Sequence, residues 1–292
     1  MAPDPAVAEV SPEALLGQAC IRLTTAQGDS ALVALHGAQV LSWMAGGRER
    51  LYLSPRAVFD GQSAIRGGMP LCFPQFNQRG SLPKHGFARN LAWRRVPPSK
   101  EVDAQSALCL ELTDSDATRA LWPERFAAQL TVTLGAGCLR VQLAVHNTGN
   151  ADDGAWDFTT ALHTYLRVED VGRARLTGLD GCARWDALAD ARDVQQGPVT
   201  FSGEYDRVFR APAGAVHLHD GAHGLQITQS TSLANTVVWN SGADLCARLP
   251  DMPPDGYRSM LCVEAAQIDQ PVTLAPGQPW QGWQELRVLP GL

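Results

Sequence analysis

The stretch that decides the fold class is QLTVTLGAGCLRVQLAVHN, residues 129–147. Apolar and polar residues alternate on both sides of the Gly-Ala-Gly at 135–137, which is typical of two half-buried strands joined by a tight turn. A second hairpin is predicted at 216–227. Further strands are predicted at 31–43, 159–168, 236–240, 260–266 and 280–289.

Helical segments are few and short. They are predicted at 11–16, at 118–127, where Pro123 interrupts the pattern, and at 185–191. Because strands are dense and do not alternate with helices, the sequence predicts an all-β protein, an antiparallel sandwich or barrel. We expect residues 19–292 to form a single domain and residues 1–18 a flexible lead-in, since no linker-like change of composition and no internal repeat occurs.

Charge and cysteine usage exclude several classes of protein. The formal net charge of −6 disfavours nucleic acid as a partner, because phosphate backbones require a basic surface. No apolar run approaches the roughly 20 residues of a membrane-spanning helix, and the first 18 residues do not resemble a secretory signal. Seven cysteines without a Cys-x-x-Cys motif argue against a disulfide framework and a structural zinc site. Free thiols and a cytoplasmic location are therefore expected.

The segment at 65–93 is irregular but carries many side chains that could bind a ligand. Glycine and proline interrupt it so often that it can be neither a regular helix nor a central strand. It carries aromatic and cationic or imidazole side chains: Phe73, Phe76, Phe87, Trp93, Arg66, His85 and Arg89. Aromatic faces can cover the C–H faces of a sugar ring while polar groups bind its hydroxyls. Composition alone fits this sugar pocket and a surface loop packed by its own aromatics equally well.

Several strings along the chain resemble the aldose 1-epimerase superfamily, most closely its hexose-6-phosphate mutarotase (glucose-6-phosphate 1-epimerase) branch. They are Ile65-Arg-Gly-Gly-Met-Pro70, Cys72-Phe-Pro74, His85-Gly-Phe-Ala-Arg-Asn90, Ala161-Leu-His-Thr-Tyr165, Tyr205-Asp-Arg-Val-Phe209, Val237-Val-Trp-Asn240, Met260-Leu-Cys-Val-Glu-Ala265 and Leu274-Ala-Pro-Gly277. The strings occur in the family's order. The resemblance implies a large galactose mutarotase-like β-sandwich whose concave face holds the sugar, and an isomerase that needs no cofactor.

The resemblance also implies roles for six residues. His163 would be the general acid and Glu264 the general base, His85 and Asp206 would contact sugar oxygens, and Arg66 and Arg89 would hold the phosphate. The chemistry agrees with the first two roles. Anomer interconversion removes a proton from the C1 hydroxyl and delivers another to the ring oxygen, so one protonated and one ionised group are needed. A histidine with a pKa of about 6.5 and a carboxylate meet that need.

Each role has a structural alternative. Alternation places His163, Tyr165 and Arg167 on one strand face, which solvent could simply cover. Glu264 lies in an apolar strand, where a carboxylate is costly unless it is paired or functional. Asp206 could pair with a neighbouring arginine, Arg207 or Arg210. Arg79, Arg94 and Arg95 remain alternatives for the phosphate, and Lys84 is given no role.

Histidines offer two candidate metal sites. His217 and His219 share a face of the predicted hairpin, with His223 across the turn, and the three could bind zinc or nickel. His85, His163 and Glu264 could form an iron site. We expect no metal at either place, because the hairpin is predicted to be exposed and mutarotation needs the other three groups free.

Two functions of different classes are consistent with the sequence. The first is a mutarotase of an aldohexose 6-phosphate, with glucose 6-phosphate expected, or a variant that acts on unphosphorylated aldoses. The second is a non-catalytic carbohydrate-binding protein, against which the retained acid–base pair argues. A sugar phosphate is the expected partner of a monomer or weak dimer. Gln75 and Trp239-Asn-Ser-Gly242 depart from the family pattern, near the expected mouth of the pocket, and leave the exact sugar open.

Overall fold

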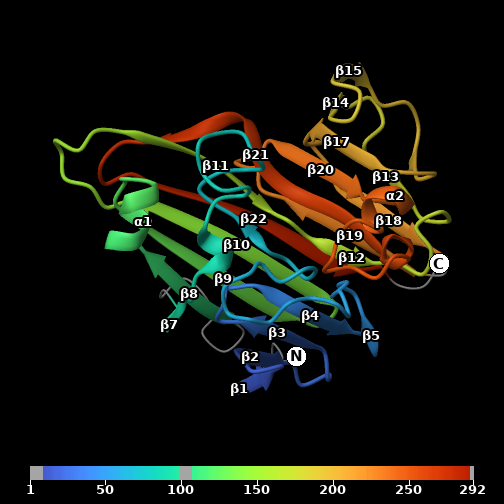
Figure 1. Ribbon diagram of the computed structural model, residues 1–292. Helices are drawn as coiled ribbons and strands as arrows, with labels where there is room; N and C mark the ends of the chain where they lie inside the picture. The colour runs from blue at the N-terminus through green and yellow to red at the C-terminus, as the bar shows by residue number, and fades with distance from the viewer. Residues whose placement is uncertain (1–8, 99–106, 222, 290–292) are drawn as a thin grey trace, which may run out of the picture.

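The computed structural model describes residues 9–98, 107–221 and 223–289, and shows three antiparallel sheets with little helix (Figure 1). Within those residues the helices are α1 (Asp116–Leu121), α2 (Gly242–Cys246) and two short 3₁₀ turns, Ala88–Asn90 and Gly256–Ser259. Neither α1 nor α2 approaches the length and apolar character that crossing a bilayer requires. The predicted all-β class is confirmed.

The sheets differ in size and in chain order. The first runs β1 (Glu9–Leu15), β2 (Gln18–Thr24), β3 (Ser30–Ala34), β4 (Val40–Ala45), β5 (Arg48–Glu49). The second runs β16 (Val199–Thr200), β13 (Arg175–Thr177), β18 (Val216–Asp220), β19 (His223–Gln229), β22 (Pro279–Val288), β10 (Cys138–Asn147), β9 (Phe126–Gly135), β8 (Ala107–Thr113), β7 (Arg94–Val96). The third runs β15 (Ala191–Val194), β14 (Ala183–Asp186), β17 (Tyr205–Arg210), β20 (Asn235–Asn240), β21 (Met260–Leu274), β11 (Trp156–Leu162), β6 (Leu71–Cys72), and β12 (Tyr165–Arg167) also pairs with β21.

The second and third sheets share one apolar core, which makes the molecule a sandwich. Leu143 and Val145 of β10 and Leu261 and Val263 of β21 belong to the same cluster of buried side chains. Burying such a side chain fully stabilises the fold by roughly 1.5–3 kcal/mol. The core therefore fixes which face of each sheet points inward and leaves the opposite face of the third sheet available for a site.

The strongest sequence patterns are confirmed. β9 and β10 pair in register from Cys138–Gly135 to Asn147–Phe126, and Gly137 takes the left-handed backbone that the tight turn requires. β18 and β19 form the second predicted hairpin. The remaining predicted strands are present, but two of them are divided. The segment 31–43 contains β3 and β4, and 159–168 is broken between β11 and β12 at His163 and Thr164.

The helix predictions are largely wrong. Residues 11–15 belong to β1, which pairs with β2 along its whole length, so the expected lead-in contains a strand and its predicted helix is absent. The segment 185–191 covers the end of β14, the turn and the first residue of β15, which pair as a hairpin. The helix predicted at 118–127 is replaced by α1, which ends before Pro123 and is followed by β9 at Phe126. Cross-strand pairing overrides weak helix propensity in both failed cases.

Candidate active site

A pocket of about 370 Å³ lies on the face of the third sheet that points away from the core. Side chains alternate along β21, so Leu261 and Val263 enter the core while Cys262 and Glu264 point to the opposite face. Glu264 is joined on the pocket floor by Asp206 and Val208 of β17 and by Val237 and Trp239 of β20. The volume suits a small polar ligand.

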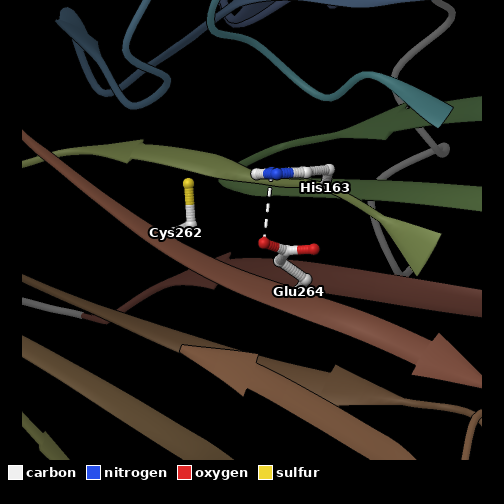
Figure 2. Close-up of side chains that lie close together, drawn as sticks. All are labelled: His163, Cys262 and Glu264. Carbon is white, nitrogen blue, oxygen red and sulfur yellow. Dashed lines mark ion pairs between the residues drawn. The ribbon is translucent and has the colours of Figure 1, made fainter. Parts of the chain in front are cut away.

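Two predicted catalytic residues, His163 and Glu264, meet at this floor (Figure 2). His163 lies at the break between β11 and β12, opposite the part of β21 that carries Glu264. Its Nδ1 is 3.2 Å from Oε1 of Glu264, but the two are not aligned as a hydrogen bond. The side chains are almost fully buried, and both Nδ1 of His163 and Oε2 of Glu264 lack a hydrogen-bond partner. Such unsatisfied buried groups are costly, which favours a functional role.

A chain of contacts fixes the imidazole ring of His163. The ring stacks on Tyr165 with centroids 4.8 Å apart and planes within 7°. The Tyr165 hydroxyl accepts a hydrogen bond of 2.9 Å from Nη1 of Arg66. Arg66 in turn pairs with Asp251 through a 3.0 Å contact of Nε with Oδ2. Arg66 therefore supports the floor of the pocket as well as lining it.

The electrostatics of the pair favour neutral groups. Burial, followed by the neighbouring His85 imidazole and the charge of Arg89, lowers the pKa of His163 well below its usual range. Burial and the neighbouring Asp206 carboxyl raise the pKa of Glu264 well above its usual range, with Arg89 opposing. Both shifts favour the uncharged form of each group, that is, a protonated Glu264 carboxyl beside a neutral His163 imidazole. This differs from the expected ionised carboxylate and protonated imidazole, because neither charge is solvated there.

His85 enters the pocket as a neutral side chain with a defined tautomer. The backbone N–H of Asn77 donates to its Nδ1 at 3.2 Å, and the Cys72 thiol lies 3.0 Å from the same atom. Because Nδ1 accepts, the ring proton is on Nε2. Burial first, then Arg89 and Lys84, lowers the pKa of His85 to about 3.

The backbone at His85 is unusual. Both His85 and Gly86 take left-handed backbone angles, with φ of 67° and 71°. A Cβ atom at Gly86 would lie 2.2 Å from the carbonyl oxygen of Phe73, so glycine is required at this close approach. A non-glycine residue held in this region is strained, and such strain concentrates at functional sites.

Asp206 also lines the pocket, and the structure does not pair it with either candidate arginine. Arg207 contacts Asp186 instead, at 2.5 Å, and donates to the backbone carbonyl of Asp206. Burial, then the charge of Glu204, raises the pKa of the Asp206 carboxyl to about 6.

Three cations line the pocket: Arg66, Lys84 and Arg89. Nη2 of Arg89 donates to the Lys84 carbonyl at 3.0 Å, which ties the two positions together. Within the described ranges neither Arg89 nor Lys84 has a carboxylate within ion-pair distance, whereas Arg66 does. Lys84 is thus a pocket cation to which the sequence assigned no role.

The alternative arginines do not line this pocket. Arg79 stacks over the Trp185 ring and lies 3.6 Å from Asp269. Arg94 pairs with Glu111, and Arg94 and Arg95 both lie on β7, the edge strand of the second sheet.

The aromatic residues of the pocket come mostly from outside the 65–93 segment. Phe76 lines the pocket, but Phe73, Phe87 and Trp93 are buried in the sandwich core. Of the two alternatives left open for this segment, the sugar pocket therefore fits Phe76 alone, and the other three aromatic side chains pack inside the protein. The rings that replace them are Trp185 and Trp239. Trp239 belongs to a string that signalled the family, whereas nothing in the sequence singled out Trp185.

The two departures from the family pattern have different positions. Gln75 is buried and braces the loop ahead of His85, since its amide donates to the carbonyls of Asn77 and Leu82. Gln75 does not line the pocket itself, but Asn77, whose carbonyl it contacts, does. Ser241 and Gly242 lead into α2, and Leu245 of that helix lines the pocket.

Neither of the two candidate histidine sites brings its three ligands together among the described residues. His219 contacts the Thr177 hydroxyl at 3.1 Å through Nε2, and His223 lies 3.9 Å from Glu169. In the part of the chain that is described, one group of three potential metal ligands comes together, and it consists of His163, Cys262 and Glu264. Cys262 thus occupies the place that the sequence hypothesis gave to His85.

Comparisons with known proteins match this chain over most of its length. The family model for aldose 1-epimerase matches residues 19–287. A Cenchrus ciliaris protein named "Putative glucose-6-phosphate 1-epimerase" is 35% identical over 92% of this chain and 84% of its own length. An Escherichia coli K12 protein of the same name is 36% identical over 87% of this chain and 85% of its own.

A solved structure of a related protein has the same fold. The crystal structure of a Salmonella typhimurium protein described as a "putative mutarotase (YeaD)" superposes with a TM-score of 0.84 and 30% identity, covering 97% of this chain and 96% of its own. The predicted galactose mutarotase-like sandwich is thereby confirmed. The chain belongs to the aldose 1-epimerase family and is an isomerase of the mutarotase type.

Proposed function

We propose that the protein interconverts the α and β anomers of an aldohexose 6-phosphate, and that glucose 6-phosphate is its substrate. One observation carries this proposal. The buried His163–Glu264 pair lies at the floor of a pocket that is also lined by Arg89 and Lys84, two cations without a carboxylate partner among the described residues. The names of the relatives in Cenchrus ciliaris and Escherichia coli support the same substrate.

The proposed mechanism uses the pair as one proton donor and one acceptor. Glu264 takes the proton of the C1 hydroxyl while His163 delivers one to the ring oxygen, which opens the ring. The aldehyde rotates about C1–C2, and the ring closes with the roles of the two groups exchanged. Since reclosure reverses opening, the single proton held by the pair is sufficient. Because the uncharged forms of both groups are favoured before the sugar binds, the proton must pass from Glu264 to His163 before the ring opens. Nδ1 of His163 lies 3.2 Å from Oε1 of Glu264, close enough for that transfer.

Three further residues would orient the sugar. His85, protonated on Nε2, is a neutral donor for a sugar oxygen, and Asp206 accepts from a hydroxyl when ionised. Trp239 stands edge-on to His163, with ring centroids 6.2 Å apart, and offers an apolar surface beside the reacting carbon. These roles for His85 and Asp206 follow the sequence hypothesis, and Trp239 is added to it.

We assign the phosphate chiefly to Arg89 and Lys84, with Arg66 contributing from one side. Arg66 already uses Nε on Asp251 and Nη1 on Tyr165, so fewer of its donors remain. The free guanidinium edge of Arg89 can form charge-assisted hydrogen bonds with phosphate oxygens.

The test compares anomerisation rates of glucose 6-phosphate and glucose, measured by polarimetry, in wild type and Arg89→Ala. Loss of a charged hydrogen bond should lower kcat/KM for glucose 6-phosphate about 10- to 150-fold and leave the rate on glucose unchanged. Arg94→Ala removes an arginine outside the pocket and should change neither rate. Equal loss on both sugars in Arg89→Ala, or a wild type that prefers glucose, would contradict the phosphate assignment.

A further inference from the structure

We propose that His163, Cys262 and Glu264 form a binding site for zinc or a similarly soft divalent ion, and that the ion inhibits the enzyme by occupying both proton-transfer groups. Inhibition rests on the proposed function, whereas ion binding does not. The ion would take no part in catalysis, which itself moves only protons.

The geometry brings three different ligand atoms together. Imidazole nitrogen, thiol sulfur and carboxylate oxygen all lie within 4.8 Å of one another (Figure 2). Cys262 and Glu264 are two residues apart on β21 and share its pocket face, while His163 approaches from the neighbouring strand break. Nitrogen, sulfur and oxygen in this combination suit zinc, which favours four-coordinate sites.

The polar atoms of the cluster have little else to bind. Nδ1 of His163 and Oε2 of Glu264 are buried without hydrogen-bond partners, and Cys262 is fully buried. A cation between the three groups would satisfy the orphaned atoms. Magnesium fits poorly, because it prefers oxygen ligands and keeps several waters.

The pocket supplies an entry path and an open coordination position. His163 and Glu264 line it directly, so an ion can arrive from solvent and keep its fourth position toward the cavity. On binding, the thiol proton of Cys262 and the proton shared by His163 and Glu264 leave to solvent. Thiolate and carboxylate then balance the charge of the ion, and the imidazole remains neutral.

Metal binding can be measured without reference to activity. Chelator-treated protein is titrated with Zn²⁺ against a chromophoric chelator, and with Co²⁺ while the thiolate-to-cobalt absorption is followed. Cys262→Ala removes one ligand, and Cys109→Ala removes a buried thiol from β8 in the second sheet as the matched control. Wild type and Cys109→Ala should bind one ion and show the thiolate band. Cys262→Ala should lose the band and at least about 10-fold in Zn²⁺ affinity, since even outer contacts of metal sites contribute that much.

Inhibition is read from anomer exchange of glucose 6-phosphate in the same proteins. Zn²⁺, but not Mg²⁺, should slow exchange in wild type and Cys109→Ala, and Cys262→Ala should require at least about 10-fold more Zn²⁺. Equal affinity or equal sensitivity in Cys262→Ala would overturn the proposal, as would a wild type that binds no Zn²⁺ or binds it without slowing exchange. A cobalt band that depends on Cys262 in a protein that catalyses no exchange would support the ion site and refute the proposed function instead.

Discussion

The β9–β10 hairpin and the pocket face of the third sheet are built from the same kind of alternating strand, but their polar side chains have different surroundings. In the hairpin, inward Leu and Val side chains fill the core, and the outward polar residues find partners. Arg140, for example, stacks over the Trp283 ring at 3.9 Å. On the pocket face, Cys262 and Glu264 alternate along β21 with the side chains that enter the core. Both are buried, and Oε2 of Glu264 has no hydrogen-bond partner.

The two regions therefore contribute different properties: the hairpin contributes stability, and the pocket face contributes the acid–base groups. The hairpin lowers the free energy of the native state through burial, while the pocket face holds neutral acids and bases whose charged forms are disfavoured. A carboxyl that is kept neutral beside a neutral imidazole is poised to exchange a proton with a ligand. Changes in the hairpin should therefore alter stability, and changes in the pocket face should alter activity and its pH dependence.

The largest expected effect on stability comes from the hairpin. Leu143→Ala should lower the free energy of unfolding by about 2–5 kcal/mol, because it leaves a cavity in the shared core. Denaturant titration measures the loss, and Leu121→Ala, an exposed position, should cost far less. Activity per folded molecule should stay unchanged. A fall in kcat for folded Leu143→Ala would show that the two regions are not separate.

A smaller effect should come from the pocket face and depend on pH. The pKa of Glu264 is raised by burial, so above about pH 4.5 the unfolded chain releases a proton that the folded chain keeps. The contribution of Glu264 to the free energy of unfolding should fall by up to about 1.4 kcal/mol per pH unit until the folded pKa is reached. The lowered pKa of His163 acts in the opposite direction below about pH 6.5, so the difference between wild type and Glu264→Gln is the quantity to measure. Glu264→Gln has no such proton, so its melting temperature relative to wild type should rise with pH.

The control for that trend is Glu285→Gln, the same substitution on β22 of the second sheet. A difference in melting temperature between Glu264→Gln and wild type that does not change with pH would mean that Glu264 is ionised in the folded protein.

The smallest expected effect is a shift in the acid limb of activity. Asp206 has a pKa of about 6, and its carboxylate form is the one proposed to accept a sugar hydroxyl. kcat/KM should therefore fall as the pH drops below about 6. Glu204→Gln removes a charge that raises this pKa and should move the limb to lower pH, by less than one unit because Glu204 is exposed. Asp186→Asn offers a comparison, because the charge of Asp186 also raises the pKa of Asp206, but more weakly than that of Glu204. An unmoved limb in Glu204→Gln would assign the limb to another group.

Sequence reasoning located the strands better than the helices. Alternation at 129–147 specified a hairpin because one face had to be buried. The segments 11–16 and 185–191 lacked such a pattern, and their pairing with distant or turn-linked strands could not be seen locally. The division of 159–168 at His163 and Thr164 was equally invisible.

The candidate site shows the same limit. All six predicted residues line one pocket, so the strings identified positions that the fold brings together, and their roles are proposals. The partners of those residues were missed, because Asp251 and Trp185 reach the site through tertiary contacts that no spacing reveals. The protonation state was also beyond the sequence, since it depends on burial that only the folded chain defines.

The central claim is that His163 and Glu264 act as one acid–base unit on the anomeric centre. The most direct measurement is NMR exchange between the anomers of glucose 6-phosphate with wild type, His163→Gln, Glu264→Gln and the double variant. Each single variant should lose about 10²- to 10⁴-fold in rate, and the double variant should lose little more, because either loss disables the unit. Unchanged rates in the single variants, or losses that multiply in the double variant, would contradict the claim.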